Sequence, residues 1–161
     1  MLYGDDHAFG LVQPKGWALD DTSGLGSRIR VVLYPKGQKW ATAGTVMYVN
    51  PIHFDEKHPR ALANLIQQDV DAFTKQSPRG KVTVAPQIKT KSGQTGEVRY
   101  FASTGRTPDE AVAYFMEQDL CMLVVLSSRE TGGFERALPT FREMAASYQF
   151  VAADIQTPTH R

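Results

Sequence analysis

The sequence predicts an α+β fold, a mainly antiparallel β-sheet of about six or seven strands with helices packed on both faces. Short segments with alternating apolar residues follow one another closely enough to pair as hairpins. Two other segments have apolar residues at spacings of three and four, as amphipathic helices do. A further run, "LCMLVVL", is apolar at every position, which is typical of a strand covered on both sides. A sheet that contains such a strand needs a helical layer over each face.

Length and composition are those of an ordinary globular protein. The chain has 161 residues, of which 42% are hydrophobic and 22% are charged. We therefore expect a single domain over residues 1–161 with a hydrophobic core over about 8–150. The formal net charge of +1 provides no overall field to attract nucleic acid. No apolar run approaches the ~18 residues of a membrane span, so we expect neither a nucleic-acid partner nor a transmembrane segment.

Three short strands and a long helix are predicted in the first half of the chain. The strands begin at Phe9, at residue 30 and at residue 45, and they stop at turn-forming sequences that contain proline or glycine. The third strand stops at Asn50-Pro51. After this strand the apolar residues are spaced by three or four positions instead of two. This apolar stripe within 55–76 predicts a helix with Pro59 in its first turn. The stripe consists of Leu62, Leu65, Ile66, Val70 and Phe73.

Two hairpins and a second helix are predicted in the second half. The hairpins pair 81–90 with 97–103 and 110–117 with 120–127. Cys121, the only cysteine, lies in the doubly apolar strand, which favours a small buried side chain over a reactive thiol. Because an interior proline breaks a helix, we expect a short turn at 134–138 and the main helix from Pro139 to about Tyr148. Residues 152–161 are expected to form a flexible tail.

Short motifs along the chain resemble the PsbP/Mog-like superfamily. Phe9 to Trp17 has the pattern F-x-L-x-x-P-x-G-W, a strand ends in Tyr34-Pro35, and Phe134 to Phe141 has the pattern F-x-x-x-L-P-x-F. A long amphipathic helix and a central apolar strand lie between them. The resemblance covers roughly residues 8 to 150 and is nearest to bacterial envelope proteins of the DcrB type, whose functions are largely unknown.

This resemblance implies a PsbP/Mog-like sandwich in which Trp17 folds back over the edge of the core as a structural residue. It also implies a bacterial domain that is exported and resides in the periplasm or at the envelope, with its leader removed. Such a domain would bind a protein or an envelope component without catalysing a reaction. The sequence does not identify that partner, and we expect a monomer or weak dimer that uses no cofactor.

The sequence motifs of common catalytic sites do not occur in the chain. It contains neither the G-x-S-x-G of a nucleophile elbow nor the H-E-x-x-H of a zinc protease. The segment "GLGSRI" lacks the third glycine of a dinucleotide loop, and "SGQTGE" lacks the lysine of a phosphate loop. We therefore expect that the protein is not an enzyme. The alternative is a hydrolase that uses His53 or Cys121 with acidic groups brought together by the fold.

Aromatic residues near predicted loops mark the surface where we expect a partner to bind. Trp40 follows "PKGQK", Tyr34 ends the second predicted strand, and Phe54 lies in the loop before the long helix. Loops often carry function, and aromatic side chains anchor interfaces. The alternative is that Trp40 tucks onto the edge of the sheet as a plug. The sequence leaves both possibilities open.

The segment "HFDEKH" offers possible metal ligands. His53, Asp55, Glu56 and His58 lie within six residues, and imidazole and carboxylate are ligands that zinc prefers. This set gives the second functional hypothesis, a metal- or small-ligand-binding module. A structural explanation is also available, because acidic residues favour the start of a helix and His58 directly before Pro59 can cap it.

Overall fold

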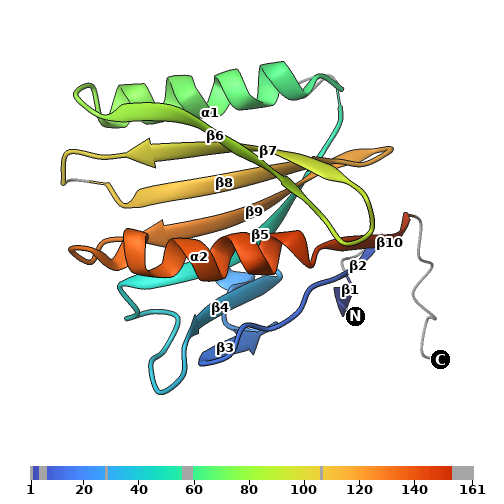
Figure 1. Cartoon of the computed structure of the whole chain (residues 1–161), viewed down its shortest axis with the longest axis horizontal. Coiled ribbons are helices and arrows are strands. Elements are labelled where there is room, and N and C mark those ends of the chain that lie inside the picture. The colour runs from blue at the N-terminus through green and yellow to red at the C-terminus, as the bar shows by residue number, and fades with distance from the viewer. Residues whose placement is uncertain (1, 4–6, 28, 56–59, 106, 154–161) are drawn as a thin grey trace.

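The computed structural model describes residues 2–3, 7–27, 29–55, 60–105 and 107–153. Within these ranges the chain forms two β-sheets, two α-helices and a 3-10 helix at Leu25–Ser27 (Figure 1). All strand pairs in the described ranges are antiparallel. The predicted α+β fold with a mainly antiparallel sheet is therefore confirmed.

The main sheet has seven strands, and their spatial order is β3-β4-β5-β9-β8-β7-β6. In chain order they are β3 (Trp17–Asp20), β4 (Val31–Pro35), β5 (Thr45–His53), β6 (Lys81–Lys89), β7 (Thr95–Ala102), β8 (Asp109–Met116) and β9 (Leu120–Ser128). The doubly apolar run forms β9, in the middle of the sheet. Every residue from Leu120 to Leu126 is buried, as its uniform apolar composition predicts.

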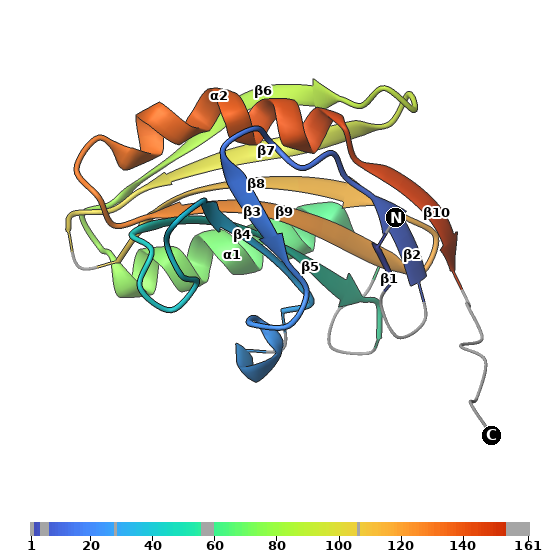
Figure 2. The same ribbon diagram turned by 90° about the horizontal axis from the view of Figure 1, so that it is seen from below.

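A second, small sheet joins the two ends of the described chain. Its strands are β1 (Leu2–Tyr3), β2 (His7–Gly10) and β10 (Gln149–Ala153), in the order β1-β2-β10 (Figure 2). Gly10 pairs with Gln149, so residues from opposite ends of the sequence lie side by side. Phe9 of β2 is buried against the ring of Tyr148, with 6.3 Å between the ring centroids.

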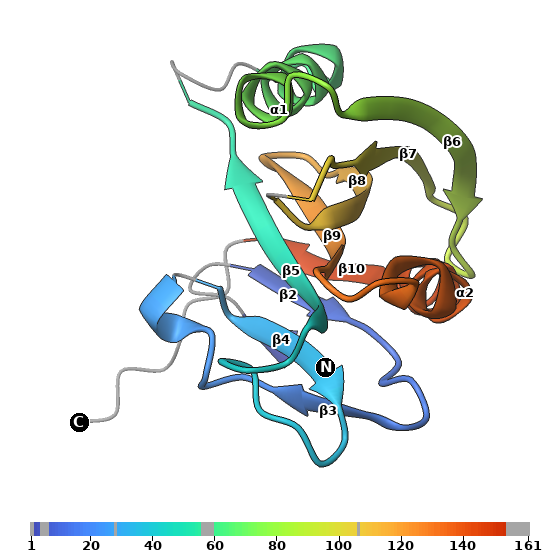
Figure 3. The same ribbon diagram turned by 90° about the vertical axis from the view of Figure 1, so that its left-hand side faces the viewer.

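The helices α1 (Leu62–Gln76) and α2 (Gly133–Ala146) cover opposite faces of the main sheet (Figure 3). Because side chains alternate along a strand, Val124 of β9 belongs to the core under α2, whereas Leu123 and Val125 belong to the core under α1. The core under α2 also holds Phe141 and residues of the small sheet. No helix in the described ranges is long and apolar enough to span a membrane.

Cys121 lies in the core under α1 and is completely buried. Burial, together with the negative charges of Asp69 and Glu117, raises the pKa of its thiol to about 12. The thiol is therefore protonated at neutral pH, whereas a cysteine nucleophile reacts as the thiolate. This environment confirms the predicted buried side chain and removes Cys121 as a nucleophile.

Two prolines lie where the sequence predicted breaks, and both predictions were wrong. β5 continues through Pro51 to His53. The neighbouring strand β4 pairs with β5 only as far as Val49. At Pro51, therefore, no β4 carbonyl is left without a donor by the missing N–H of proline. α2 is one continuous helix with Pro139 inside it. Pro139 has no N–H to donate to the carbonyl oxygen of Glu135, four residues earlier. Both residues are exposed, so water can bind this carbonyl instead.

Three strands, β1, β3 and β10, were not predicted from the sequence. Trp17 begins β3 and packs, partly buried, against the core under α2, so it is structural as predicted but is part of the sheet. The turn before it is closed by the N–H of Trp17 donating to the carbonyl oxygen of Pro14 (3.2 Å), and Gly16 has a φ of 82° that suits glycine. Ala152 and Ala153 belong to β10 and not to a flexible tail. The remaining tail, 154–161, lies outside the described residues.

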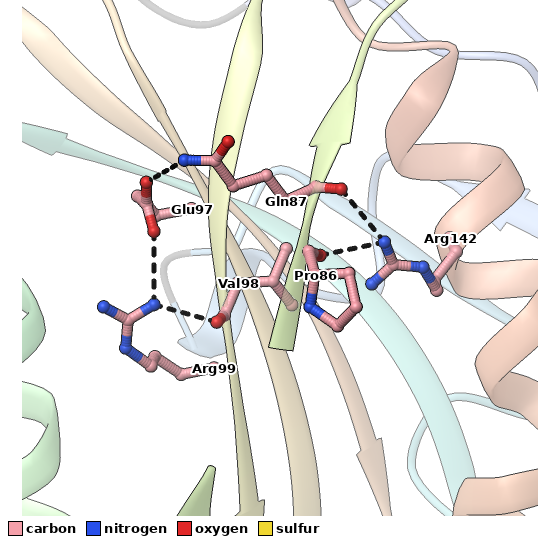
Figure 4. Close-up of polar contacts among 6 residues, drawn as sticks. All are labelled: Pro86, Gln87, Glu97, Val98, Arg99 and Arg142. Atoms are coloured by element: carbon pink, nitrogen blue, oxygen red, sulfur yellow. Dashed lines mark hydrogen bonds and ion pairs between the residues drawn. The ribbon is translucent and has the colours of Figure 1, made fainter. Parts of the chain in front are cut away.

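Arg142 of α2 holds the irregular part of the edge strand β6. The pairing of β6 with β7 shifts between Ala85 and Ile88. There the Arg142 guanidinium donates to the carbonyl oxygens of Pro86 (2.9 Å) and Gln87 (3.1 Å), as Figure 4 shows. On the other side of the irregularity, Glu97 accepts hydrogen bonds from the side chains of Gln87 and Arg99 (Figure 4). The two Arg142 contacts satisfy carbonyl groups that the ladder leaves unpaired.

Replacing Arg142 with alanine should lower the free energy of unfolding by about 1–3 kcal/mol, because the substitution removes charge-assisted bonds to carbonyl groups. Urea denaturation measures the loss, and amide hydrogen exchange should accelerate in β6 more than in β9. Arg136→Ala is the matched control, since Arg136 lies on the same helix with 68% of its side chain exposed. An equal loss of stability in both variants would show that the hydrogen bonds from Arg142 to β6 do not stabilise the fold.

Candidate functional site

A cleft of about 300 Å³ opens between α1 and the main sheet. Tyr48 and Ile52 of β5 and Leu123 and Val125 of β9 line its floor, with Val112 of β8 beside them. The register explains this floor, because Tyr48 pairs with Val125 and Val125 pairs with Val112. Side chains in one such row point to the same face of a sheet. The floor is therefore apolar apart from the tyrosine hydroxyl and the side-chain amide of Asn50, which lies between Tyr48 and Ile52 on the same face of β5.

The helix wall of the cleft comes from the C-terminal half of α1. Leu65 and Ile66, in its first half, are buried against the sheet. Asp69 follows Ile66 by three positions and Phe73 follows Asp69 by four, which keeps all three residues on the same side of the helix. Both residues line the cleft. The apolar stripe of α1 therefore carries one acidic residue toward the sheet.

The carboxyl group of Asp69 is held by a tyrosine from the sheet. The hydroxyl of Tyr114, on β8, donates to Oδ2 of Asp69 at 2.6 Å. Burial raises the pKa of Asp69 above its ordinary value, although this hydrogen bond favours the charged form and so acts in the opposite direction. Asp69 is thus oriented, partly desolvated and close to the floor.

Glu110 supplies a second carboxyl from the sheet side. It pairs with Ser127 of β9 and Phe101 of β7, one row beyond Val112. Burial raises its pKa, the Ser127 hydroxyl lowers it, the charge of Asp69 raises it again, and Arg129 lowers it. The two acids are thus electrostatically coupled across the cleft.

Tyr48 of β5 lies in the same cleft as Asp69 and Glu110 and is affected by the charges of both. Burial raises the pKa of its hydroxyl, and the negative charges of Glu110 and Asp69 raise it further. The hydroxyl therefore remains neutral and can donate a hydrogen bond. Its ring adds an aromatic surface to the floor.

These groups suit binding better than nucleophilic catalysis. None of the described residues that line the cleft is His, Ser, Cys, Lys or Arg. The Thr107 side chain also lines the cleft, but its hydroxyl makes no hydrogen bond to a described residue, whereas nucleophilic catalysis needs a nucleophile in contact with a base. His53, proposed for the hydrolase alternative, is exposed at the end of β5 and is not among the lining residues.

Comparisons with known proteins bear on the fold. No family model matches the sequence, and no curated protein matches it. The solution structure of cyanobacterial PsbP (CyanoP) from Synechocystis sp. PCC 6803 is similar, with a TM-score of 0.56 and 12% sequence identity, over 89% of this chain and 86% of that chain. This chain has a PsbP-like fold. At this identity the similarity establishes architecture alone, and function must be argued from the site.

Within the PsbP-like fold, Trp40 and Tyr34 lie on the face of the sheet that carries the cleft. Trp40 packs edge-on against Tyr48, with 6.3 Å between ring centroids and 83° between ring planes. The Tyr34 hydroxyl donates to Oδ2 of Asp20 at 2.9 Å. Trp40 is partly buried, so it both covers Tyr48 and keeps some surface for a partner.

Phe54, the third residue of the predicted patch, lies elsewhere. It follows the last residue of β5, donates its N–H to the carbonyl oxygen of Asp119 (3.1 Å) and packs against the core under α1. Six residues of extended chain separate it from Tyr48, a span of roughly 20 Å. The three aromatics therefore do not form one compact patch.

The predicted metal ligands can be placed only in part. His53 and Asp55 are exposed, whereas Glu56 and His58 lie outside the described residues. Among the described residues, no three His, Cys, Asp or Glu side chains gather in a way that could hold a metal ion. Metal binding by this segment remains a prediction, which elemental analysis of untagged protein can test.

The acids of the cleft were not identified from the sequence, although each leaves a local signal. Asp69 interrupts the apolar stripe of its helix, and Glu110 alternates with Val112 and Tyr114 along its strand. Either pattern indicates a carboxyl on a face that packs inward. Only the fold shows that both faces meet at one cleft.

Proposed function

We propose that this chain is a non-enzymatic domain that binds a protein or an envelope component, with the cleft between α1 and the main sheet as its binding site. The composition of the cleft carries the proposal. It combines an apolar floor with two carboxyls and, among the described residues that line it, no His, Ser, Cys, Lys or Arg. Binding sites are typically concave and mostly apolar, with a few polar groups that orient what they hold.

Aromatic residues beside the cleft support a macromolecular partner. Tyr48 belongs to the floor, and Trp40 packs against it from the loop between β4 and β5. Large, rigid aromatic side chains contribute much of the binding energy in protein interfaces. A partner that entered the cleft would therefore contact Trp40 at its rim.

We also propose that the domain is bacterial, exported and located in the periplasm or at the envelope, as a monomer or weak dimer. The motifs of Phe9 to Trp17 and Phe134 to Phe141, which resemble those of DcrB-type envelope proteins, support this location. Cell fractionation of the full-length gene product tests the location. Recovery in the cytoplasm with an uncleaved N-terminus would refute export.

Filling the cleft should abolish partner binding. Ala72 lines the cleft and is exposed on α1, so Ala72→Trp places a large ring in the cleft without removing a core side chain. We expect the affinity for the component captured from envelope extract to fall at least about tenfold, which corresponds to about 1.4 kcal/mol. Calorimetric titration with that purified component measures the change.

Ala63→Trp is the matched control, because Ala63 is also exposed on α1 but does not line the cleft. It should bind the captured component as the wild type does. Equal affinity of the wild type, the Ala72 variant and the control would show that the partner binds somewhere else, and the proposed site would be wrong.

A further inference from the structure

We infer that the cleft receives a lysine side chain from a partner protein, with the aliphatic stem on the apolar floor and the ammonium group against the carboxyls of Asp69 and Glu110. This inference rests on the proposed function and names the chemistry of the group that is bound. It depends on the size of the cleft, its apolar floor, its two acids and a hydroxyl without a partner.

The size and floor of the cleft suit one extended side chain. Its volume of about 300 Å³ lies at the lower limit of small-molecule sites, which span roughly 300–1,000 Å³. Leu123, Val125 and Val112 form a continuous apolar surface along the floor. Lysine buries its methylene stem along such a surface and keeps its charged end near polar groups.

The two acids lie on different elements and lack a cation within the cleft. Asp69 is on α1 and Glu110 is on β8, and no Lys or Arg is among the described residues that line the site. A partly buried carboxylate without a positive partner is costly, and a second one nearby adds repulsion. Arg129 acts on Glu110 without lining the cleft. An entering ammonium group would offset both costs.

Besides the two acids, the Thr107 side chain brings to the lining a hydroxyl that has no partner in the described structure. The hydroxyl oxygen of Thr107, in the connection between β7 and β8, is buried and makes no hydrogen bond to any described residue. Thr107 lines the same cleft as the two acids. A buried hydroxyl without a hydrogen bond is destabilising. An ammonium group has three N–H donors, so donation to the two carboxyls leaves one donor for a neutral oxygen of the lining, that of Thr107 or of Asn50.

Binding should be linked to proton release. Burial raises the pKa of both carboxyls, so a fraction of each is protonated in the empty site at mildly acidic pH. A bound ammonium lowers these pKa values and expels the protons. The groups that face the acids are Tyr114 and Tyr48, whose raised pKa values keep them neutral, and the guanidinium of Arg129, which acts on Glu110. Affinity should therefore rise with pH through the titration of the carboxyls.

Butylammonium, which reproduces the lysine stem and its charged end, is the first probe. NMR titration at neutral pH should shift the amide signals of Val125 and Ala72, whereas butanol and butyrate should bind at least about tenfold more weakly. The double substitution Asp69→Asn with Glu110→Gln should reduce butylammonium affinity at least about tenfold. Both replacements keep an acceptor for Tyr114 and Ser127, which preserves the fold.

Asp71→Asn is the control, because it removes the same charge from an exposed position on α1 outside the cleft. It should leave butylammonium affinity unchanged. Equal losses in the control and the double variant, or butyrate binding as tightly as butylammonium, would overturn the inference. A wild-type affinity that falls as pH rises from 4.5 to 7 would also overturn it.

A peptide experiment distinguishes a lysine of a partner from a free amine. A short peptide with one lysine should bind, and the same peptide with norleucine in its place should not. Binding of butylammonium without binding of the lysine peptide would refute a protein source. If Ala72→Trp abolishes partner capture but the double substitution does not, the cleft is the binding site and the lysine inference alone fails.

Discussion

Replacing Phe141 with alanine is expected to lower the free energy of unfolding by about 3–5 kcal/mol. Phe141 is completely buried in the core between α2 and the sheet. Truncation removes its apolar surface from the core and leaves a cavity that the packed β9 and α2 close only in part. Urea denaturation followed by circular dichroism measures the loss.

Val84→Ala is the control for this substitution, because Val84 is an apolar residue with 71% of its surface exposed. It should change the stability by no more than about 0.5 kcal/mol. A loss of less than about 1 kcal/mol for Phe141→Ala would mean that α2 is not the element that closes this core.

Replacing Glu117 with alanine is the second large effect that we expect. Oε1 of Glu117 accepts hydrogen bonds from the hydroxyl of Tyr148 (2.8 Å) and the side-chain amide of Gln94 (2.7 Å). These bonds tie the turn between β8 and β9 to the end of α2. Alanine leaves both donors without their acceptor, and each should cost about 1–3 kcal/mol. Thermal and urea unfolding of the variant at neutral pH measure the sum.

The pH dependence of stability gives this prediction a sharper test. Burial raises the pKa of Glu117 above its ordinary value of 4.5, although its two hydrogen bonds favour the charged form. Because the pKa of Glu117 is higher in the folded than in the unfolded state, its protonation stabilises the fold. This contribution to the free energy of unfolding is complete below pH 4.5 and is lost as the pH rises through the folded-state pKa. The pKa values of Asp69 and Glu110 are raised in the same direction and add to this loss.

Glu117→Gln is the matched variant, because it keeps a hydrogen-bond acceptor but cannot ionise. Its stability should decline less than that of the wild type between pH 4.5 and neutrality.

Asp20 has the opposite effect on the pH dependence of stability, since hydrogen bonds from Ser23 and Thr22 lower its pKa. Its contribution is lost only below the ordinary value of 3.8, outside this window. A wild-type stability that rises from pH 4.5 to neutrality would contradict the assignment.

Local patterns were sufficient to predict much of the fold. The uniformly apolar run from Leu120 to Leu126 required a strand with both faces covered, and β9 is the central strand between the layers of α1 and α2. The stripe of α1 and the two hairpins of the second half were also visible, since their periodicity comes from residues close in sequence. The structure confirms each of these elements, but α1 begins only at Leu62, seven residues after the start of the predicted segment at 55, and Pro59 lies outside the described residues.

Features that depend on distant residues were not predictable in this way. β10 exists because β2 pairs with it from the other end of the chain. Pro51 and Pro139 disfavour strand and helix locally, yet Pro51 is tolerated because β4 does not pair beside it and Pro139 because it lies on the exposed side of α2. The cleft also depends on residues that are distant in the sequence. Asp69 and Glu110 are 41 positions apart, and only the packing of α1 on β8 brings them to one site.

The pairing of Gly10 with Gln149 places β2 and β10 in the layer that closes the core under α2, whereas the cleft opens under α1. Breaking this pairing, for example by deleting β2 or β10, is therefore expected to open the core under α2 and to leave the residues that line the cleft in place.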